Sequence, residues 1–320
     1  MKRDIGIDII KLLAALLITN SHMNNYYPDS ISFLGTGGAI GDALFFFCSG
    51  FTLFLKPMGR FDNWYKRRIS RIYPTAICWI LFSVVFLGDD KTISSALSWS
   101  GGWFVKCIMI YYVIIFLINK FAINHLKITF ITTFTAIWIC YFIWDLPAEI
   151  SIYGDSYFTW VQYFIYMLFG AIVGTNIIKT LSGQKALFLL IASILSFYGI
   201  MFFSQRSNII NDLEIVSMIS LLGIVYSMYS LCNCNKAKRI YSNTAVKWII
   251  MFIGGMCLEI YIVQGYLLPR INFDIIFPFN FITALLIIFI FAYILKCFTR
   301  LVNQTFSDKP YNWPEIFKTI

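Results

Sequence analysis

Residues 8–22 read Asp8-Ile-Ile-Lys11-Leu-Leu-Ala-Ala-Leu-Leu-Ile-Thr-Asn-Ser-His22, an apolar run that carries three ionisable residues. On a helix, Asp8 and Lys11 are i,i+3 neighbours, and His22 returns to the same face close to three turns after Lys11. A charged side chain at the bilayer centre costs roughly 2.5–3.5 kcal/mol, so such residues usually face the interior of a bundle or a watery cavity. We therefore predict that this helix forms one wall of a reaction site.

The composition places the whole chain in the membrane class. Of its 320 residues, 59% are hydrophobic and only 13% are charged, whereas a soluble domain has about 25% charged residues. We predict an all-α fold, a polytopic integral membrane bundle of about ten transmembrane helices. The apolar runs that predict these helices are residues 5–21, 38–55, 74–88, 103–119, 128–144, 158–176, 186–204, 214–231, 248–268 and 279–298.

The loops between these runs alternate in charge. Of the 25 Lys and Arg residues, 20 fall on the side that holds both termini and three on the other side. By the positive-inside rule both termini are cytoplasmic, and the net charge of +9 reflects topology rather than a nucleic-acid partner. No linker rich in Pro, Ser or charge divides the chain, so we predict one transmembrane domain, residues 1–300, and a cytoplasmic tail, residues 301–320.

The eight cysteines lie in predicted spans or at the cytoplasmic edge, which predicts no disulfide framework. Cys232 and Cys234 have no partner ligands nearby in the sequence, and we predict no metal site.

A carboxylate stands at the start of the second apolar run. The run enters from the outer side, so Asp42 lies at about the depth of His22, and Ser49 lies about two turns deeper. A carboxylate that faces an imidazole fixes its tautomer and raises its basicity, which would make His22 a general base. The alternative is that Asp42 only caps the helix in interfacial water. Gly50 either allows a close helix approach or leaves room for a ligand.

A basic segment follows on the predicted cytoplasmic side. It reads Trp64-Tyr-Lys-Arg-Arg68-Ile-Ser-Arg71-Ile-Tyr73-Pro74. Arg68 and Arg71 share a helical face, and planar guanidinium groups bind phosphate oxygens in pairs, which suits a polyanionic nucleotide. The alternative is a juxtamembrane cluster that binds anionic lipid and sets topology.

Three later residues are also candidates. Trp103 opens a span after two glycines, either as an aromatic-belt anchor or as a face that stacks a sugar. Glu259 lies near the middle of an apolar run, where it must be paired, protonated or facing water. Gln264 lies outward of Glu259, nearer the depth of His22. In the sixth span, Gly170 and Gly174 form a Gly-x-x-x-Gly pattern typical of helix packing.

Taken together, these motifs resemble the membrane-bound acyltransferase family 3, integral-membrane O-acyltransferases that modify bacterial surface polysaccharides. The family pattern of Asp, two residues, Arg, ten residues and His is similar to Asp8, Lys11 and His22. Further segments that resemble the family are Gly41–Phe51 with its Ser-Gly-Phe end, Arg68 to Pro74, Trp103 to Tyr112 and Leu258 to Val263. Lys11 replaces the usual Arg, and Gln264 stands where many relatives have a second His.

The resemblance implies transfer of an acyl group, commonly acetyl, from cytoplasmic acyl-CoA to a hydroxyl of an extracytoplasmic glycan or lipid-linked sugar. It places the protein in the bacterial cytoplasmic membrane, among membrane lipids, as a multi-pass enzyme. We assign catalysis, donor binding and acceptor binding to three groups of residues. They are His22, Asp42, Lys11 and Glu259 for catalysis; Arg68, Arg71, Tyr73 and Ser49 for acetyl-CoA or another acyl-CoA; and Trp103, Asp8 and Gln264 for the acceptor.

Three alternatives stay open from the sequence. The acceptor hydroxyl attacks the thioester directly, which we favour, or an acyl-histidine forms first. A transporter or flippase for a lipid-linked saccharide would also need a ten-helix bundle with intramembrane charges. A structural relative without activity is the third reading.

Overall fold

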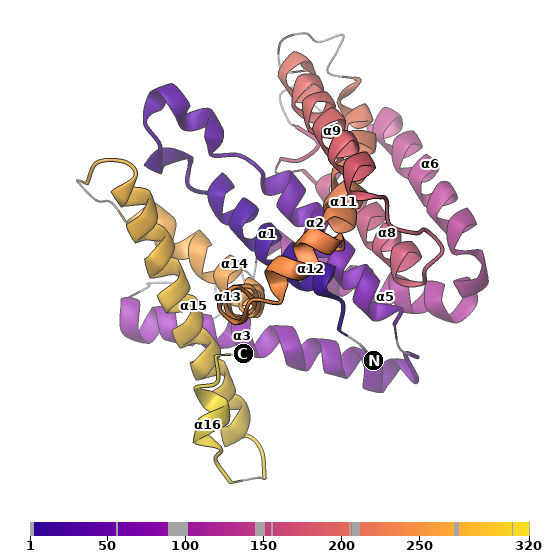
Figure 1. Ribbon diagram of the computed structural model, residues 1–320. Helices are drawn as coiled ribbons and strands as arrows, with labels where there is room; N and C mark the ends of the chain where they lie inside the picture. The colour runs from indigo at the N-terminus through magenta and orange to yellow at the C-terminus, as the bar shows by residue number, and fades with distance from the viewer. Residues whose placement is uncertain are drawn as a thin grey trace. The chain divides into compact units, whose positions relative to one another are not determined.

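The computed structural model describes residues 3–55, 57–88, 102–144, 151–154, 156–204, 206, 212–271, 275–308 and 310–319. Within these ranges every regular element is an α-helix or a short 3-10 helix, which confirms the all-α prediction (Figure 1). The α-helices are α1 (Ile5–Ser21), α2 (Gly38–Leu53), α3 (Phe61–Leu87), α5 (Gly102–Phe121), α6 (Leu126–Trp144), α7 (Thr159–Gln162), α8 (Phe164–Gly174), α9 (Gly183–Ser204), α11 (Ser217–Cys232), α12 (Asn235–Tyr241), α13 (Thr244–Gly254), α14 (Cys257–Leu267), α15 (Phe279–Thr305) and α16 (Trp313–Ile316). The 3-10 helices are η1 (Asn24–Tyr26), η2 (Asp29–Leu34), η3 (Ile123–His125), η4 (Glu214–Val216) and η5 (Leu268–Arg270).

All ten predicted apolar runs fall on helices, and several of these helices are long enough to cross a bilayer. Among the described residues, seven have the length and hydropathy of a span, or eight if the bent pair α13 and α14 is one span. α1 has 17 residues, and the apolar segment Thr159–Gly174 is also shorter than a full span. The protein is therefore a polytopic membrane bundle, while the count of ten and the side of the termini stay predictions.

Two predicted boundaries are wrong. The third run was expected to begin at residue 74, after a loop, but α3 begins at Phe61 and contains Pro74 in its interior. Pro74 removes one backbone donor without ending the helix, as is tolerated where neighbours satisfy the freed group. The run 248–268 is not one straight helix, because the segments Thr244–Gly254 and Cys257–Arg270 meet at an angle of 61°.

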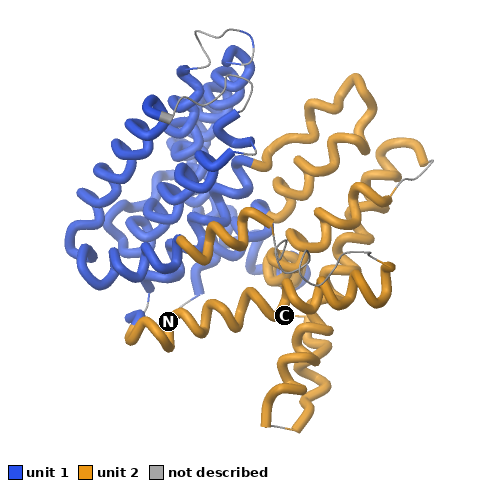
Figure 2. Tube along the Cα trace, turned by 180° about the vertical axis from the view of Figure 1, so that it is seen from behind, with its two compact units in different colours: residues 1–14, 39–58, 111–247 blue, residues 15–38, 59–110, 248–320 orange. Residues whose placement is uncertain are grey.

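The chain divides into two compact units that are interleaved along the sequence (Figure 2). Unit 1 holds residues 1–14, 39–58 and 111–247, and unit 2 holds residues 15–38, 59–110 and 248–320. α1, α2, α5 and α13 each contribute residues to both units. The predicted division into residues 1–300 and a tail at 301–320 stays a prediction.

In unit 1, glycines let the backbones of α2 and α8 approach closely. A Cβ added to Gly50 would lie 1.8 Å from the Met167 carbonyl oxygen, and one added to Gly170 would lie 2.1 Å from the Phe47 carbonyl oxygen. Gly174 has a similar contact with Phe51. Small residues at membrane helix interfaces serve this purpose. The helix-packing interpretation of Gly50 and of the Gly-x-x-x-Gly pattern is confirmed.

In unit 2, aromatic and aliphatic side chains of α3, α14 and α15 form a common core. The Trp79 and Tyr266 rings meet edge to face with centroids 5.7 Å apart, and Ile262, Val263 and Leu295 are buried in the same cluster. This core fixes α14, which carries Glu259 and Gln264.

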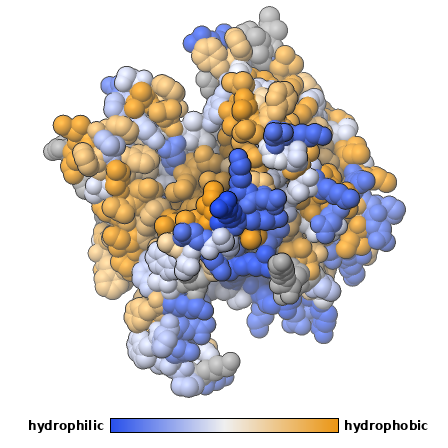
Figure 3. Space-filling view, in the orientation of Figure 1, coloured by the Kyte–Doolittle hydropathy of each residue, from blue (hydrophilic) through white to orange (hydrophobic). Residues whose placement is uncertain are grey.

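The outer faces of several helices are apolar and exposed. Phe188 and Leu195 on α9 are 77% and 69% exposed, and Leu286 and Ile290 on α15 are also exposed. In Figure 3 the upper part of α15 is apolar, and the surface becomes more hydrophilic toward α16. Contiguous exposed apolar surface of this kind fits contact with lipid.

Candidate active site

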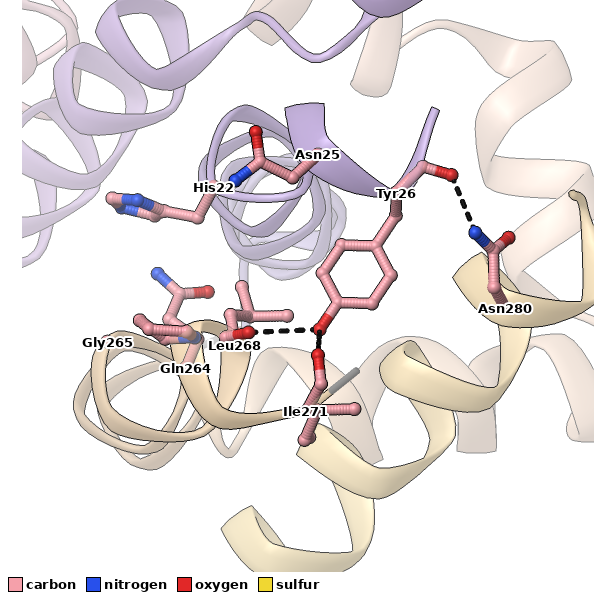
Figure 4. A pocket seen from close by; sticks show the side chains of 9 residues that line it. His22, Asn25, Tyr26, Gln264, Gly265, Leu268, Ile271 and Asn280 are labelled. Carbon is pink, nitrogen blue, oxygen red and sulfur yellow. Dashed lines mark hydrogen bonds between the residues drawn. The ribbon is translucent and has the colours of Figure 1, made fainter. Parts of the chain in front are cut away.

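Unit 2 contains a pocket with a volume of about 560 Å³ (Figure 4). Its walls come from the turn after α1, from η1, from the end of α14 with η5, and from the start of α15. The residues that line it are His22, Asn25, Tyr26, Gln264, Gly265, Leu268, Pro269, Ile271 and Asn280. Of the predicted site residues, His22 and Gln264 are brought together here.

His22 lies directly after the last residue of α1. Its backbone N–H donates to the Thr19 carbonyl at 3.1 Å, which tightens the final turn. The face that His22 was predicted to share with Lys11 stays a prediction. Part of the imidazole contacts solvent, yet the surrounding protein still desolvates it and lowers its pKa. A lowered pKa keeps the ring neutral near pH 7, which is the form that accepts a proton.

Gln264 is held by a buried hydrogen bond from α1. The Thr19 hydroxyl lies 2.7 Å from Gln264 Oε1 and donates to it, and it lies 2.9 Å from the Ala15 carbonyl oxygen. Thr19 and Gln264 are each only 1% exposed. Gln264 Nε2 is buried without a hydrogen-bond partner, and Figure 4 shows it turned toward the His22 ring. Leaving a buried donor unsatisfied costs about 1–3 kcal/mol.

Tyr26 fixes the opposite wall. Its hydroxyl lies 3.0 Å from the Leu268 carbonyl oxygen and 2.7 Å from the Ile271 carbonyl oxygen, and it donates its one proton to this pair. Asn280 Nδ2 donates to the Tyr26 carbonyl at 2.9 Å (Figure 4). These bonds join η1, η5 and the first turn of α15, so the pocket wall is built from segments 242 to 254 residues apart in sequence.

Glu259 lies in the first turn of α14, away from the pocket lining. Lys296 and Arg300 on α15 and Arg71 on α3 lie near enough to Glu259 to interact with it electrostatically. Lys296 Nζ also donates to the Gly255 carbonyl at 3.2 Å, at the bend between α13 and α14. At 1.5 Å per residue, Gln264 is about 7.5 Å further along the α14 axis. One short helix therefore connects a basic cluster to the His22 pocket.

The remaining donor-site candidates of unit 2 lie on α3. The Arg68 guanidinium is 5.1 Å from the Trp64 ring centroid, a cation–π contact, and Tyr73 is half-buried. Arg71 is exposed. Arg68 and Arg71 are both helical, which agrees with the shared face expected from their spacing.

Trp103 is the second residue of α5 and does not line the pocket. It meets the Phe104 ring edge to face at 6.0 Å, and Phe104 packs against Tyr261 of α14 at 5.2 Å. Gly102, with φ +64°, precedes it and faces the Tyr261 hydroxyl. The start of α5 is thus packed on α14 within unit 2.

Comparison with known proteins identifies the family. The acyltransferase-domain family matches residues 4–301 of the chain. The chain belongs to the membrane-bound acyltransferase family 3. No curated protein and no solved structure matches it.

In this acyltransferase, four predicted site residues belong to unit 1. Asp42 and Ser49 lie on α2, and Asp8 and Lys11 lie on the first part of α1. His22 belongs to unit 2, so the dyad of His22 and Asp42 stays a prediction. The Asp8 carboxylate accepts hydrogen bonds from Arg3 at 2.5 Å and from the Tyr241 hydroxyl at 2.9 Å. Its acceptor-binding role also stays a prediction.

Several residues at the candidate site were not predicted from the sequence. Thr19 holds the pocket residue Gln264 by a hydrogen bond, and Asn280 lines the pocket and donates to the Tyr26 carbonyl. Neither residue belongs to a local sequence motif. Lys296 did carry a signal, because it is a charge inside the apolar helix α15. In the part of the chain that the structure describes, no group of three or more His, Cys, Asp or Glu residues could hold a metal ion.

Proposed function

We propose that this acyltransferase moves an acyl group, commonly acetyl, from acyl-CoA on the cytoplasmic side to a hydroxyl of an extracytoplasmic glycan or lipid-linked sugar. His22 is the general base. The observation that carries the proposal is the pocket in which a neutral imidazole and a buried amide face the same space. The basic cluster at the other end of α14 supports an anionic donor approaching from that end.

The reaction needs one proton acceptor. The acceptor oxygen attacks the thioester carbonyl carbon while its proton passes to the His22 imidazole, and the carbonyl electron pair moves onto oxygen. Collapse of this tetrahedral species breaks the C–S bond. The CoA thiolate then takes the proton from the His22 imidazolium, so the base is restored.

The donor is held by charge. Arg68 and Arg71 bind the phosphates of CoA from α3, with Tyr73 and Ser49 beside the donor. Asp42 orients His22, while Lys11 and Glu259 adjust the charge of the passage between donor and acceptor. In the alternative order of steps, the acyl group passes first to His22, and the acceptor hydroxyl then attacks the acyl-histidine.

The test uses the two histidines of the chain as a matched pair. Purified protein in lipid nanodiscs is given radiolabelled acetyl-CoA, and release of CoA and transfer of label are followed for the wild type, His22→Ala and His125→Ala. We expect His22→Ala to lose roughly 10²–10⁴-fold in rate, the usual contribution of a general base. His125 lies in η3, away from the pocket lining, and His125→Ala should keep its rate.

Full transfer by a folded His22→Ala variant would refute the proposal. Label that stays on the wild-type protein after denaturation and is absent from His22→Ala would establish the acyl-histidine order.

One observation favours transport as the second candidate. The 61° bend between the segments Thr244–Gly254 and Cys257–Arg270 resembles the broken helices that line transporter sites. Transport of a lipid-linked saccharide in vesicles without acetyl-CoA, unaffected by His22→Ala, would support it.

A further inference from the structure

The Gln264 amide has a buried polar atom that the folded chain does not use. The residue is 1% exposed, and Nε2 has no hydrogen-bond partner. Such groups are rare in native proteins and call for an explanation. Because this one lines a pocket, the simplest explanation is a ligand atom that accepts its hydrogen bond.

Two other polar side chains of the pocket wall, Tyr26 and Asn280, are already engaged in hydrogen bonds within the protein. The Tyr26 hydroxyl donates its proton to the pair of carbonyl oxygens of Leu268 and Ile271. Asn280 Nδ2 donates to the Tyr26 carbonyl. Beside these two side chains, Gln264 Nε2 is a buried donor left for a substrate. It also lies on the same side of the pocket as the His22 ring (Figure 4).

Thr19 sets which end of the amide faces the pocket. Its hydroxyl donates to Oε1 at 2.7 Å, so the oxygen is held against α1 and the nitrogen points away from it. The Thr19 side chain of α1 thus positions a donor from α14 before any ligand binds. Preorganised donors of this kind are what stabilise a negative charge that develops during a reaction.

We propose that Gln264 Nε2 donates a hydrogen bond to the carbonyl oxygen of the acyl group under transfer, and that Thr19 is its positioning residue. The inference rests on the proposed function. As the acceptor oxygen forms its bond to the carbonyl carbon, the carbonyl π electrons move to oxygen, and the hydroxyl proton moves to His22. Gln264 stabilises that oxyanion until the C–S bond breaks and the electron pair leaves on sulfur.

The chemistry distinguishes a donor from an acceptor at this position. Gln264→Glu keeps the shape and an acceptor oxygen but places a carboxylate where the N–H donor was. If the amide were rotated, with Oε1 in the pocket and Nε2 on Thr19, the same variant would keep the pocket-facing acceptor. The two orientations therefore give opposite results with one substitution.

The experiment measures kcat and KM for acetyl-CoA with purified wild type, Gln264→Glu, Gln264→Met, Thr19→Val and Thr19→Ser. We expect Gln264→Glu and Gln264→Met to lower kcat about 10²–10³-fold, the usual loss for one oxyanion donor, with little change in KM. Gln264→Met carries no buried charge, so it reports on the donor even if the Gln264→Glu variant folds poorly. Thr19→Val should lose part of the rate, and Thr19→Ser should restore most of what Thr19→Val loses.

Two further readouts separate catalysis from structure. At lower pH the carboxyl group introduced by Gln264→Glu regains a proton and can donate, so the deficit of this variant relative to wild type should shrink, while that of Gln264→Met should not. Size-exclusion profiles and thermal melts show whether each variant is folded.

The two variants Gln264→Met and His22→Ala distinguish failure of the oxyanion role from failure of the proposed function. A folded Gln264→Met variant with wild-type kcat, measured beside an inactive His22→Ala, overturns the oxyanion role and leaves the base in place. A rise in KM with unchanged kcat also overturns the oxyanion role, since it would assign Gln264 to ground-state binding. If His22→Ala keeps the wild-type kcat while Gln264→Met has a lowered kcat, His22 is instead refuted as the base.

Discussion

At the scale of single residues, the pKa of the proposed base, His22, predicts the pH dependence of the rate. Desolvation by the surrounding protein disfavours the imidazolium, so the pKa lies below the ordinary value of 6.5. The neutral base is then present above that pKa and lost below it. We predict that kcat/KM is flat through neutral pH and falls at acid pH with a midpoint below 6.5, measured from initial rates between pH 5 and 8.

A midpoint at or above 6.5 would contradict this assignment. Asp42 provides a second check, because a carboxylate facing His22 favours the imidazolium. If the predicted dyad is correct, Asp42→Asn moves the midpoint to still lower pH.

The hydrogen bond between Tyr241 and Asp8 is a structural contact at the residue scale. Burial, followed by the hydrogen bond to the Asp8 carboxylate, raises the pKa of Tyr241 to about 12, so its hydroxyl stays protonated and donates at 2.9 Å. Hydrogen bonds to charged groups contribute about 1.5–3 kcal/mol. We predict that Tyr241→Phe lowers the melting temperature in detergent while acetyl-CoA turnover by the folded fraction is kept. An unchanged melt would show that Arg3 alone satisfies Asp8.

Sequence reasoning singled out two residues of the pocket, His22 and Gln264, for different reasons. His22 stood out as an imidazole at the end of an apolar run, and Gln264 was predicted to lie near its depth; the structure places both in one pocket. Thr19 and Tyr26 could not be found in this way. Their roles depend on hydrogen bonds to partners 242–245 residues away, which no local pattern encodes.

At the scale of helices, hydropathy predicts where helices exist better than where they begin or bend. The basic first part of α3, from Phe61 to Arg71, is not apolar, so its helix was not included in the predicted span. The bend before α14 lies inside an unbroken apolar run, where only Gly254 and Gly255 mark it. Charge and backbone geometry, rather than hydrophobicity, decide both features.

The packing of α2 on α8 gives a prediction at this scale. A Cβ at position 50 would overlap the Met167 carbonyl oxygen at 1.8 Å, whereas one at Gly199 of α9 meets nothing within 4 Å. We predict that Gly50→Ala destabilises the protein by about 1–3 kcal/mol, as overpacking does. Gly199→Ala should be neutral or stabilising by up to about 1 kcal/mol, because alanine loses less backbone entropy in a helix. Thermal melts of the pair measure the difference, and equal melting temperatures would refute the close approach.

At the scale of the whole molecule, the division into two units was not visible in the sequence. The chain passes between the units at residues 14–15, 38–39, 58–59, 110–111 and 247–248. Four of these crossings fall inside helices, namely α1, α2, α5 and α13. At the crossings in α1 and α5, neither composition nor hydropathy changes. A unit built from separate stretches has no linker to mark it, so only tertiary contacts define it.

At the same scale, the proposed transfer across a membrane requires that the donor and acceptor ends of the site open to different sides. The distribution of charge predicts which side each end faces. With 20 Lys and Arg residues on one side and three on the other, both termini and the start of α3 are predicted to be cytoplasmic, and the turn after α1 to be outside. In intact cells, an impermeant maleimide should label Asp29→Cys but not Gly59→Cys, and permeabilisation should expose Gly59→Cys. The wild-type protein serves as the control that shows how strongly the maleimide labels the native cysteines. Labelling of Gly59→Cys without permeabilisation would place Arg68 and Arg71 on the same side as His22, and a cytoplasmic donor could not then reach them.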